Sequence, residues 1–178
     1  MTSNDDTAFD PALEAALRAR VGQYLVGALE GRGVRVGLAC ARFNGAVTTR
    51  LLDGALAALA ECGVDRSDVT IAWAPGAFEL PLVARGFARG EQVDVVVTLG
   101  AVIRGDTGHY EVVAGECARG VQDVQLATGV PVVFGVLTTN TVEQAWERSR
   151  PDATNKGRES ALTALEMVNL LRQRVFTS

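Results

Sequence analysis

The stretch VDVVVTLGAVI, residues 93–103, decides the fold class of this 178-residue chain. It is an almost unbroken apolar run, without the apolar–polar alternation that marks a strand with one face in water. Such runs are typical of strands buried on both faces of a parallel sheet. Three further apolar runs are expected to form strands: VRVGLACA at 34–41, VTIAWAP at 69–75 and PVVFGVLTT at 131–139.

Each of these runs precedes a segment with helical spacing. After the first run, apolar residues recur at helical intervals from Leu51 to Leu59, and the pattern stops at Gly63. Further helices are expected at 78–90, 108–129, 141–150 and 156–174. Four strand-then-helix units predict an α/β fold with three αβα layers, in which helices cover both faces of a four-stranded parallel sheet. Ligands of such sheets bind at the carboxyl ends of the strands.

The composition indicates one globular domain and a small-molecule or protein partner. Hydrophobic residues make up 48% of the chain and charged residues 21%, and the formal net charge of −4 comes without a basic stripe. Nucleic-acid binding is therefore not expected. The first twenty residues are polar, and no run reaches the roughly 18 apolar residues that a membrane span needs. Membrane insertion and secretion are thus disfavoured, and a cytoplasmic location is expected.

Two local features add to this description. Residues 1–9 are expected to be disordered, whereas Asp10 and Pro11 have the residue types that cap and open a helix, here expected to run to about residue 30. The three cysteines, Cys40, Cys62 and Cys117, show no CxxC spacing and have no histidine near enough to complete a zinc set. They are interpreted as buried structural thiols, and no metal site is predicted.

Three strand ends have local interpretations that need no ligand. In ARFNG, after the first strand, Phe43 could plug the core and Asn44 could cap the next helix. In APGAFELP, after the second strand, Glu79 would favour a helix start through the helix dipole. After the fourth strand, Arg148 lies two helical turns beyond TNT and is expected to face solvent.

The third strand end, IRGDTGHY, favours a functional interpretation. Gly105 and Gly108 are expected to allow unusual backbone angles, and Thr107 offers a hydroxyl beside the free N–H groups of a helix start. Such a helix start binds anions. His109, the sole histidine of the chain, follows directly, and imidazole exchanges protons near neutral pH. This segment therefore predicts an acid–base residue beside an anion site.

The sequence also lacks several catalytic motifs. It contains no G-x-S-x-G, Walker-type loop, H-E-x-x-H or G-x-G-x-x-G, which argues against serine hydrolysis, nucleotide phosphoryl transfer, zinc proteolysis and dinucleotide-dependent redox chemistry. Lys156 is the single lysine, and it stands near a predicted helix start rather than in an apolar pocket. If the reaction passes through an imine, an amine supplied by the substrate is the simpler hypothesis.

Taken together, five segments resemble the 6,7-dimethyl-8-ribityllumazine synthase family. They occur in order between about Val34 and Leu171: ARFN, WAPGAFELP, TLGAVIRGDTGHYEVV, GVPVVFGVLTTNTVEQAWERS and NKGRESALTALEMVNL. The resemblance implies a sheet of flavodoxin-like topology, assembled as a homopentamer or a multiple of it, with active sites at subunit interfaces. It divides the chain into an N-terminal extension, 1–33, partly disordered or helical, and a lumazine synthase domain, 34–178.

The resemblance also implies a reaction. In this family 5-amino-6-(D-ribitylamino)uracil condenses with 3,4-dihydroxy-2-butanone 4-phosphate to give the lumazine, phosphate and water, the penultimate step of riboflavin biosynthesis, without a metal or organic cofactor. The uracil supplies the amine, so no catalytic lysine is required. Two alternatives stay open: a riboflavin synthase acting on lumazine, and a non-catalytic flavin-binding or shell-forming homologue. Riboflavin synthase is a further candidate partner.

Site residues are implied in the same way. His109 matches the proton-transfer residue of the family. The residues matching the binding site of the ribitylaminouracil are Phe43, Ala77, Phe78, Glu79, Ala101, Val102, Ile103 and, from the neighbouring subunit, Phe134. Those matching the phosphate site are Asp106, Thr107 and, from the neighbouring subunit, Arg148.

Two departures from the family pattern carry expectations of their own. Gly108 replaces the proline or threonine that often precedes the family's histidine, which predicts a looser loop. The segment RSRPDATNKG lacks the glycine- and lysine-containing turn associated with sixty-subunit shells. Pro151 and Asp152 in that segment favour a pentamer or paired pentamers.

Overall fold

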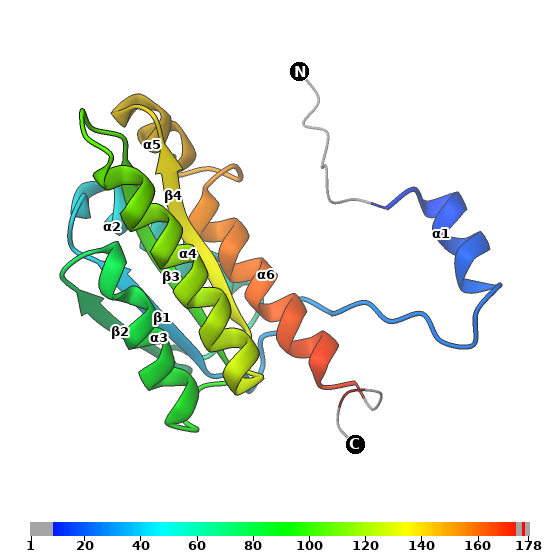
Figure 1. The fold of residues 1–178 in the computed structure, drawn as a ribbon. Coiled ribbons are helices and arrows are strands. Elements are labelled where there is room, and N and C mark those ends of the chain that lie inside the picture. Colours follow the sequence, from blue (N-terminus) through cyan, green and yellow to red (C-terminus); the bar gives the residue numbers. More distant parts are fainter. Residues whose placement is uncertain (1–8, 174–175, 177–178) are drawn as a thin grey trace.

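The computed structural model describes residues 9–173 and 176, and its centre is one four-stranded sheet (Figure 1). All strand pairs are parallel, and the spatial order is β2-β1-β3-β4. The strands are β1 (Val36–Ala41), β2 (Val69–Ala74), β3 (Val95–Ile103) and β4 (Val132–Thr139). The two central strands, β1 and β3, are buried almost throughout, as their unbroken apolar runs predict.

Helices cover both faces of the sheet, which confirms the predicted α/β architecture with its parallel sheet. One face carries α2 (Gly45–Glu61), α5 (Val142–Arg148) and α6 (Lys156–Leu171). The other carries α3 (Leu80–Arg89) and α4 (His109–Thr128), which pack against each other along the sheet (Figure 1). Two short 3-10 turns, Arg66–Asp68 and Ala77–Glu79, precede β2 and α3. None of the helices in the described part of the chain is long and apolar enough to cross a bilayer.

The predicted N-terminal helix is correct at its start and wrong in its length. Asp10 Oδ1 accepts hydrogen bonds from the N–H groups of Ala12 and Leu13, both at 3.0 Å, and Pro11 opens α1 (Pro11–Arg18). The helix then ends at Arg18 rather than near residue 30. None of its residues is buried, and it stands apart from the sheet and its helices (Figure 1). A helix this short gains little from hydrogen bonds alone.

Contacts with α6 explain why the chain after α1 is extended rather than helical. Asn169 Nδ2 donates to the carbonyl oxygens of Ala28 and Glu30, at 2.9 and 2.8 Å. Gly27 lies so close to α6 that an added Cβ would be 1.9 Å from the Glu166 carbonyl oxygen. The backbone groups that a helix would pair internally are thus bonded to another element, which helical periodicity in the sequence does not reveal.

The remaining boundaries agree closely with the sequence pattern. The helix expected to stop at Gly63 ends at Glu61, and Gly63 has a φ of 86°, a left-handed conformation that favours glycine. The last helix ends at Leu171, three residues before the predicted end at Arg174, which lies outside the described residues. The disorder expected for residues 1–9 also falls outside the described range, except for Phe9.

Charged residues at the amino end of the sheet form a compact network. Asp94, directly before β3, accepts hydrogen bonds from the Arg35 backbone N–H at 2.8 Å and from Arg35 Nη2 at 2.9 Å. Arg172 Nη2 lies 3.2 Å from the same carboxylate. Partial burial opposes ionisation of Asp94, but the hydrogen bonds from Arg35 outweigh it and hold the pKa of this carboxyl below its ordinary value.

Candidate active site

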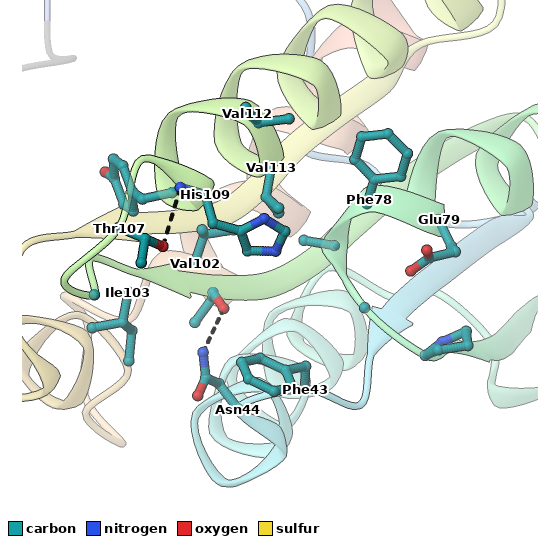
Figure 2. Close-up of a pocket in the computed structure, with 16 residues that line it drawn as sticks. Phe43, Asn44, Phe78, Glu79, Val102, Ile103, Thr107, His109, Val112 and Val113 are labelled. Atoms are coloured by element: carbon teal, nitrogen blue, oxygen red, sulfur yellow. Dashed lines mark hydrogen bonds between the residues drawn. The ribbon is translucent and has the colours of Figure 1, made fainter.

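A pocket of about 650 Å³ opens at the carboxyl ends of β1, β2 and β3, where the topology predicts a ligand site (Figure 2). Its walls come from the three strand ends and the first turns of α4. The lining residues are Phe43, Asn44, Pro75, Gly76, Ala77, Phe78, Glu79, Ala101, Val102, Ile103, Gly105, Thr107, His109, Tyr110, Val112 and Val113.

The turn after β1 presents an aromatic ring to this pocket. Phe43 is 72% exposed in the single chain, so its interpretation as a core plug is wrong. Asn44 occupies the N-cap position of α2 with a φ of 57°, but its side chain forms no cap hydrogen bond. Instead Asn44 Nδ2 donates to the Ala101 carbonyl oxygen at 2.8 Å. Asn44 therefore ties the turn below Phe43 to the end of β3, a role that capping statistics could not indicate.

The turn after β2 places a carboxylate at the pocket rim. Ala77 is buried, whereas Phe78 is 54% exposed, and its ring lies well apart from that of Phe43, with the His109 imidazole drawn between the two (Figure 2). Glu79 stands directly before α3, as predicted, but its side chain does not cap that helix. A Cβ on Gly76 would lie 3.1 Å from Glu79 Oε2, so glycine at 76 gives the carboxylate room. The Glu79 carboxylate is consequently available to a ligand.

Apolar residues at the end of β3 form the floor of the pocket. Ala101 and Val102 are buried, and Ile103 is partly exposed at the strand's last position. The floor excludes water from the inner side of any flat ring that enters between it and Phe43. Specificity must then come from polar groups at the rim.

The loop after β3 ends in His109, the first residue of α4. Its imidazole points into the pocket, and its backbone N–H lies 3.4 Å from Thr107 Oγ1 (Figure 2). The expectation of unusual backbone angles in this loop is wrong, since neither Gly105 nor Gly108 has a positive φ. Gly108 has φ −67° and ψ 5°, and an added Cβ at either glycine would meet no atom within 4 Å.

Arg104 is the cation nearest to this loop in sequence, and it is fully engaged. It forms an ion pair with Glu111, its guanidinium lies 4.1 Å from the centre of the Tyr110 ring, and its Nε donates to Asn140 Oδ1 at 3.0 Å. The hydrogen bond with Glu111 raises the pKa of Arg104 and lowers that of Glu111. Among the described residues, those lining the pocket include no lysine or arginine. A phosphate in this pocket would need a cation from elsewhere.

Three predicted site residues lie outside the pocket of the single chain. Asp106 is exposed in the loop but does not line the cavity. Phe134 is 38% exposed on the edge strand β4, and Arg148 is exposed at the end of α5. The last two are the residues that the resemblance assigns to a neighbouring subunit. The other nine predicted site residues all line one cavity.

Comparison with known proteins is consistent with this geometry. The family model described as 6,7-dimethyl-8-ribityllumazine synthase matches residues 33–172. Proteins named 6,7-dimethyl-8-ribityllumazine synthase from two strains of Thermus thermophilus are each 55% identical to this chain over 143 residues, which is 80% of this chain and 91% of the relative. The chain belongs to the 6,7-dimethyl-8-ribityllumazine synthase family. The family and enzyme class predicted from the sequence are therefore confirmed.

Several residues of this lumazine synthase pocket were not singled out in the sequence. Tyr110, Val112 and Val113 belong to the first two turns of α4 and line the cavity together with His109. Val112 and Val113 stand three and four positions after His109, the spacing that places side chains on one helix face. Helical periodicity counted from His109 would have found these two.

The cysteines play no part in this site. Burial raises the pKa of the Cys40 thiol to about 12 and that of the Cys117 thiol to about 11, and both are fully buried, as predicted. Cys62 is only partly buried. Within the described residues no group of three His, Cys, Asp or Glu side chains is arranged to hold a metal ion. Catalysis without a metal or organic cofactor remains a prediction.

Proposed function

We propose that this lumazine synthase joins 5-amino-6-(D-ribitylamino)uracil and 3,4-dihydroxy-2-butanone 4-phosphate in the pocket at the strand ends. The products are 6,7-dimethyl-8-ribityllumazine, phosphate and water, and the step is the penultimate one of riboflavin biosynthesis. One observation carries the residue assignment: an exposed aromatic ring, Phe43, and the sole imidazole, His109, line one apolar cavity with a carboxylate at its rim.

The pyrimidine half of the site is the apolar one. Phe43 stacks on the ring, and Ala101, Val102 and Ile103 form the opposite wall. Backbone groups of residues 77 and 78 bind the ring edge. The Glu79 carboxylate accepts hydrogen bonds from ribityl hydroxyls, because among residues 9–173 and 176 no donor occupies it. A substrate without these hydroxyls would leave the carboxylate unpaired, which gives selectivity for the ribityl chain.

The phosphate half lies at the loop 104–108. The free N–H groups at the start of the 20-residue helix α4 and the Thr107 hydroxyl bind the anion, helped by the helix dipole. Asp106 contributes its backbone N–H, and its side chain points away. Arg148 of a neighbouring subunit supplies the positive charge, since guanidinium binds phosphate through two parallel hydrogen bonds.

His109 moves protons between these two halves. The substrate amine attacks the butanone carbonyl, and water leaves to give an imine. Loss of phosphate gives an enol that becomes a ketone, and the ribityl-bearing nitrogen attacks this ketone and closes the ring as a second water leaves. The imidazole accepts and returns the protons that these steps release, which contributes about 10²–10⁴-fold to the rate. Holding both substrates side by side supplies most of the rest, with effective molarities of about 10⁵ M or more.

The proposal includes a homopentamer, or a multiple of it, in the cytoplasm. Phe43 and Phe78 are exposed on the single chain, and a neighbouring copy that contributes Phe134 and Arg148 would cover this open side. The free cysteines fit a reducing compartment.

One experiment tests the reaction and the assembly together. Purified protein is mixed with both substrates, the lumazine chromophore is recorded, and mass is measured by light scattering in the same sample. Chromophore formation above the spontaneous background is expected from a pentamer or a multiple of it. Folded protein without such formation would overturn the enzyme assignment. Consumption of lumazine without the butanone phosphate would indicate a riboflavin synthase, and flavin binding without turnover a non-catalytic homologue.

A further inference from the structure

Arg148 ends α5, and its orientation depends on the chain segment that follows. Its side chain is exposed and makes no hydrogen bond or ion pair within residues 9–173 and 176. A long side chain without partners is directed chiefly by its backbone. What fixes residues 149 and 150 therefore decides where the Arg148 guanidinium can reach.

Ser149, the next residue, is held from two sides. It is fully buried, and its hydroxyl donates to the Ala145 carbonyl oxygen at 2.9 Å, within α5. Its own carbonyl oxygen accepts from Arg50 Nε of α2 at 3.1 Å. The Arg50 guanidinium also lies 4.8 Å from the centre of the Trp146 ring. One side chain of α2, that of Arg50, thus contacts the chain on both sides of Arg148, at Trp146 and at Ser149.

Asn155 holds Arg150, the residue that follows Ser149. It is 1% exposed, and its Nδ2 donates to the Arg150 carbonyl oxygen at 2.8 Å and to the Arg50 carbonyl oxygen at 3.2 Å. Its Oδ1 accepts the N–H groups of Gly157 and Arg158, at 2.8 and 3.2 Å, and so caps α6. All four hydrogen-bonding positions of this buried amide are used.

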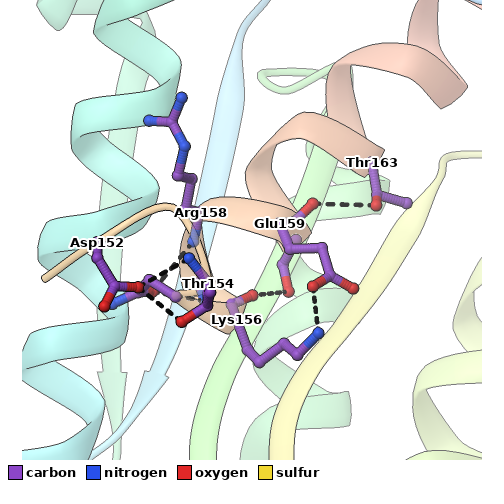
Figure 3. Close-up of polar contacts among 9 residues, drawn as sticks. Asp152, Thr154, Lys156, Arg158, Glu159 and Thr163 are labelled. Atoms are coloured by element: carbon purple, nitrogen blue, oxygen red, sulfur yellow. Dashed lines mark hydrogen bonds and ion pairs between the residues drawn. The ribbon is translucent and has the colours of Figure 1, made fainter. Parts of the chain in front are cut away.

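Close packing leaves this junction little freedom. A Cβ on Gly54 would lie 2.4 Å from Asn155 Oδ1, and a Cβ on Gly157 would lie 1.9 Å from the Leu51 carbonyl oxygen. The intervening loop is also tied internally, because Asp152 Oδ1 accepts from the backbone N–H and the hydroxyl of Thr154, at 2.8 and 2.6 Å (Figure 3). The segment 149–155 is therefore bonded to α2 at Ser149 and Asn155 and to α6 at Asn155, and the loop between these two residues is held by its own hydrogen bonds.

We propose that Arg50 and Asn155 are positioning residues for Arg148: together they fix the two carbonyl groups that follow it. This inference rests on the proposed function, in which Arg148 reaches the phosphate in a neighbouring pocket. A preorganised guanidinium loses less entropy when it binds. A separate contact joins α2 to α6, the ion pair of Arg158 with Glu61 at 2.6 Å. This ion pair does not involve residues 148–150, so it can serve as a comparison.

The test is a double-mutant cycle with Arg50→Ala and Arg148→Ala. Loss of an arginine contact that pre-aligns a charge should raise KM for the butanone phosphate about tenfold in Arg50→Ala, and about 10- to 100-fold in Arg148→Ala. KM for the pyrimidine should stay unchanged in both. In the Arg148→Ala background, Arg50→Ala should add nothing, because it acts through Arg148. Arg158→Ala is the matched control and should leave both KM values unchanged.

The outcomes separate this proposal from the one on which it rests. If Arg148→Ala leaves KM for the butanone phosphate unchanged, the phosphate role of Arg148 is wrong, and its positioning with it. If Arg148→Ala raises that KM but folded Arg50→Ala does not, or if the two effects multiply, the positioning role alone is overturned. Should Arg50→Ala fail to fold, Arg50→Lys decides: it keeps the charge near Trp146 but lacks Nε, and it should show the same selective KM increase.

Discussion

The two ends of the sheet differ in how their polar groups are partnered. At the amino end, Arg35, Asp94 and Arg172 satisfy one another at 2.8–3.2 Å. At the carboxyl end, Glu79 and His109 face a cavity, and the contact from the His109 N–H to Thr107 is a long 3.4 Å. The amino end of the sheet thus stabilises the fold, whereas at the carboxyl end the Glu79 carboxylate and the His109 imidazole have no partner among residues 9–173 and 176 and face the cavity.

The largest expected effect of a substitution at the carboxyl edge is on rate. On the proposed assignment, His109→Ala should lower kcat about 10²–10⁴-fold, since it removes the acid–base group but leaves both substrates held together. The midpoint of urea unfolding should not change, because the side chain is exposed. Steady-state kinetics and urea titration measure the two quantities. Complete loss of turnover in a folded variant would mean that the imidazole does more than transfer protons.

Near the carboxyl end of the sheet, Asn155 differs from Glu79 and His109 because it is buried and fully hydrogen-bonded. Asn155→Ala should lower the free energy of unfolding by about 2–3 kcal/mol, since buried carbonyl and N–H partners lose their bonds. Thr163→Ala is the control on α6 and should change stability by no more than about 0.5 kcal/mol. Equal losses in both variants would show that the junction is no more than ordinary helix packing.

A substitution at the amino end of the sheet should change stability and leave the reaction rate unchanged. Asp94→Asn should lower the free energy of unfolding by about 1–2 kcal/mol, because Arg35 and Arg172 lose their partner charge. Asp123→Asn breaks an exposed ion pair on α4 and should cost no more than about 0.5 kcal/mol. A change in kcat for Asp94→Asn without a change in oligomer mass would contradict the view that the amino end of the sheet affects stability alone.

The same substitution has a pH signature. The pKa of Asp94 is lowered in the folded state, so its contribution to stability is fully present above the unfolded pKa of about 3.9 and is lost as the pH falls through the lower folded value. Unfolding midpoints measured from pH 7 down to about 3 should therefore converge for wild type and Asp94→Asn at the acid end. Parallel curves would show that the carboxyl is not shifted.

The smallest expected effect concerns the backbone of the loop 104–108. Gly108 has φ −67°, and a Cβ there would meet no atom within 4 Å. Gly108→Ala should therefore raise the free energy of unfolding by about 0.4–1 kcal/mol, by restricting the unfolded chain. Calorimetry at fixed protein concentration measures the gain. A loss of stability would indicate a backbone conformation that disfavours side chains.

The sheet could be predicted from the sequence because the signals are local. The predicted run 93–103 differs from β3 (Val95–Ile103) by two residues at its start, since nearly every residue of a central strand is apolar because both faces of the strand are buried. The extension after Arg18 could not be predicted. Its backbone bonds to Asn169, roughly 140 positions away, and helical periodicity contains no information about that contact.

The site divides in the same way. Phe43, Glu79 and His109 follow strands, so topology alone brings them together. Asn44 and Asn155 bond to backbone groups 57 and 105 positions away. An amide side chain near a helix start has the same local pattern whether it caps the helix or ties two elements together, so the sequence favoured capping for Asn44.

The engagement of Arg104 has a consequence for ligand binding by a single subunit. Its charge is balanced by Glu111, and its planar face is occupied by Tyr110, so it contributes little positive potential to the cavity that it borders. On the proposed assignment, a dissociated protomer would hold the neutral heterocycle and repel the dianion. The affinity for the phosphorylated sugar would then depend on whether the subunits are assembled. On dilution, binding of this substrate would be lost before binding of the heterocycle.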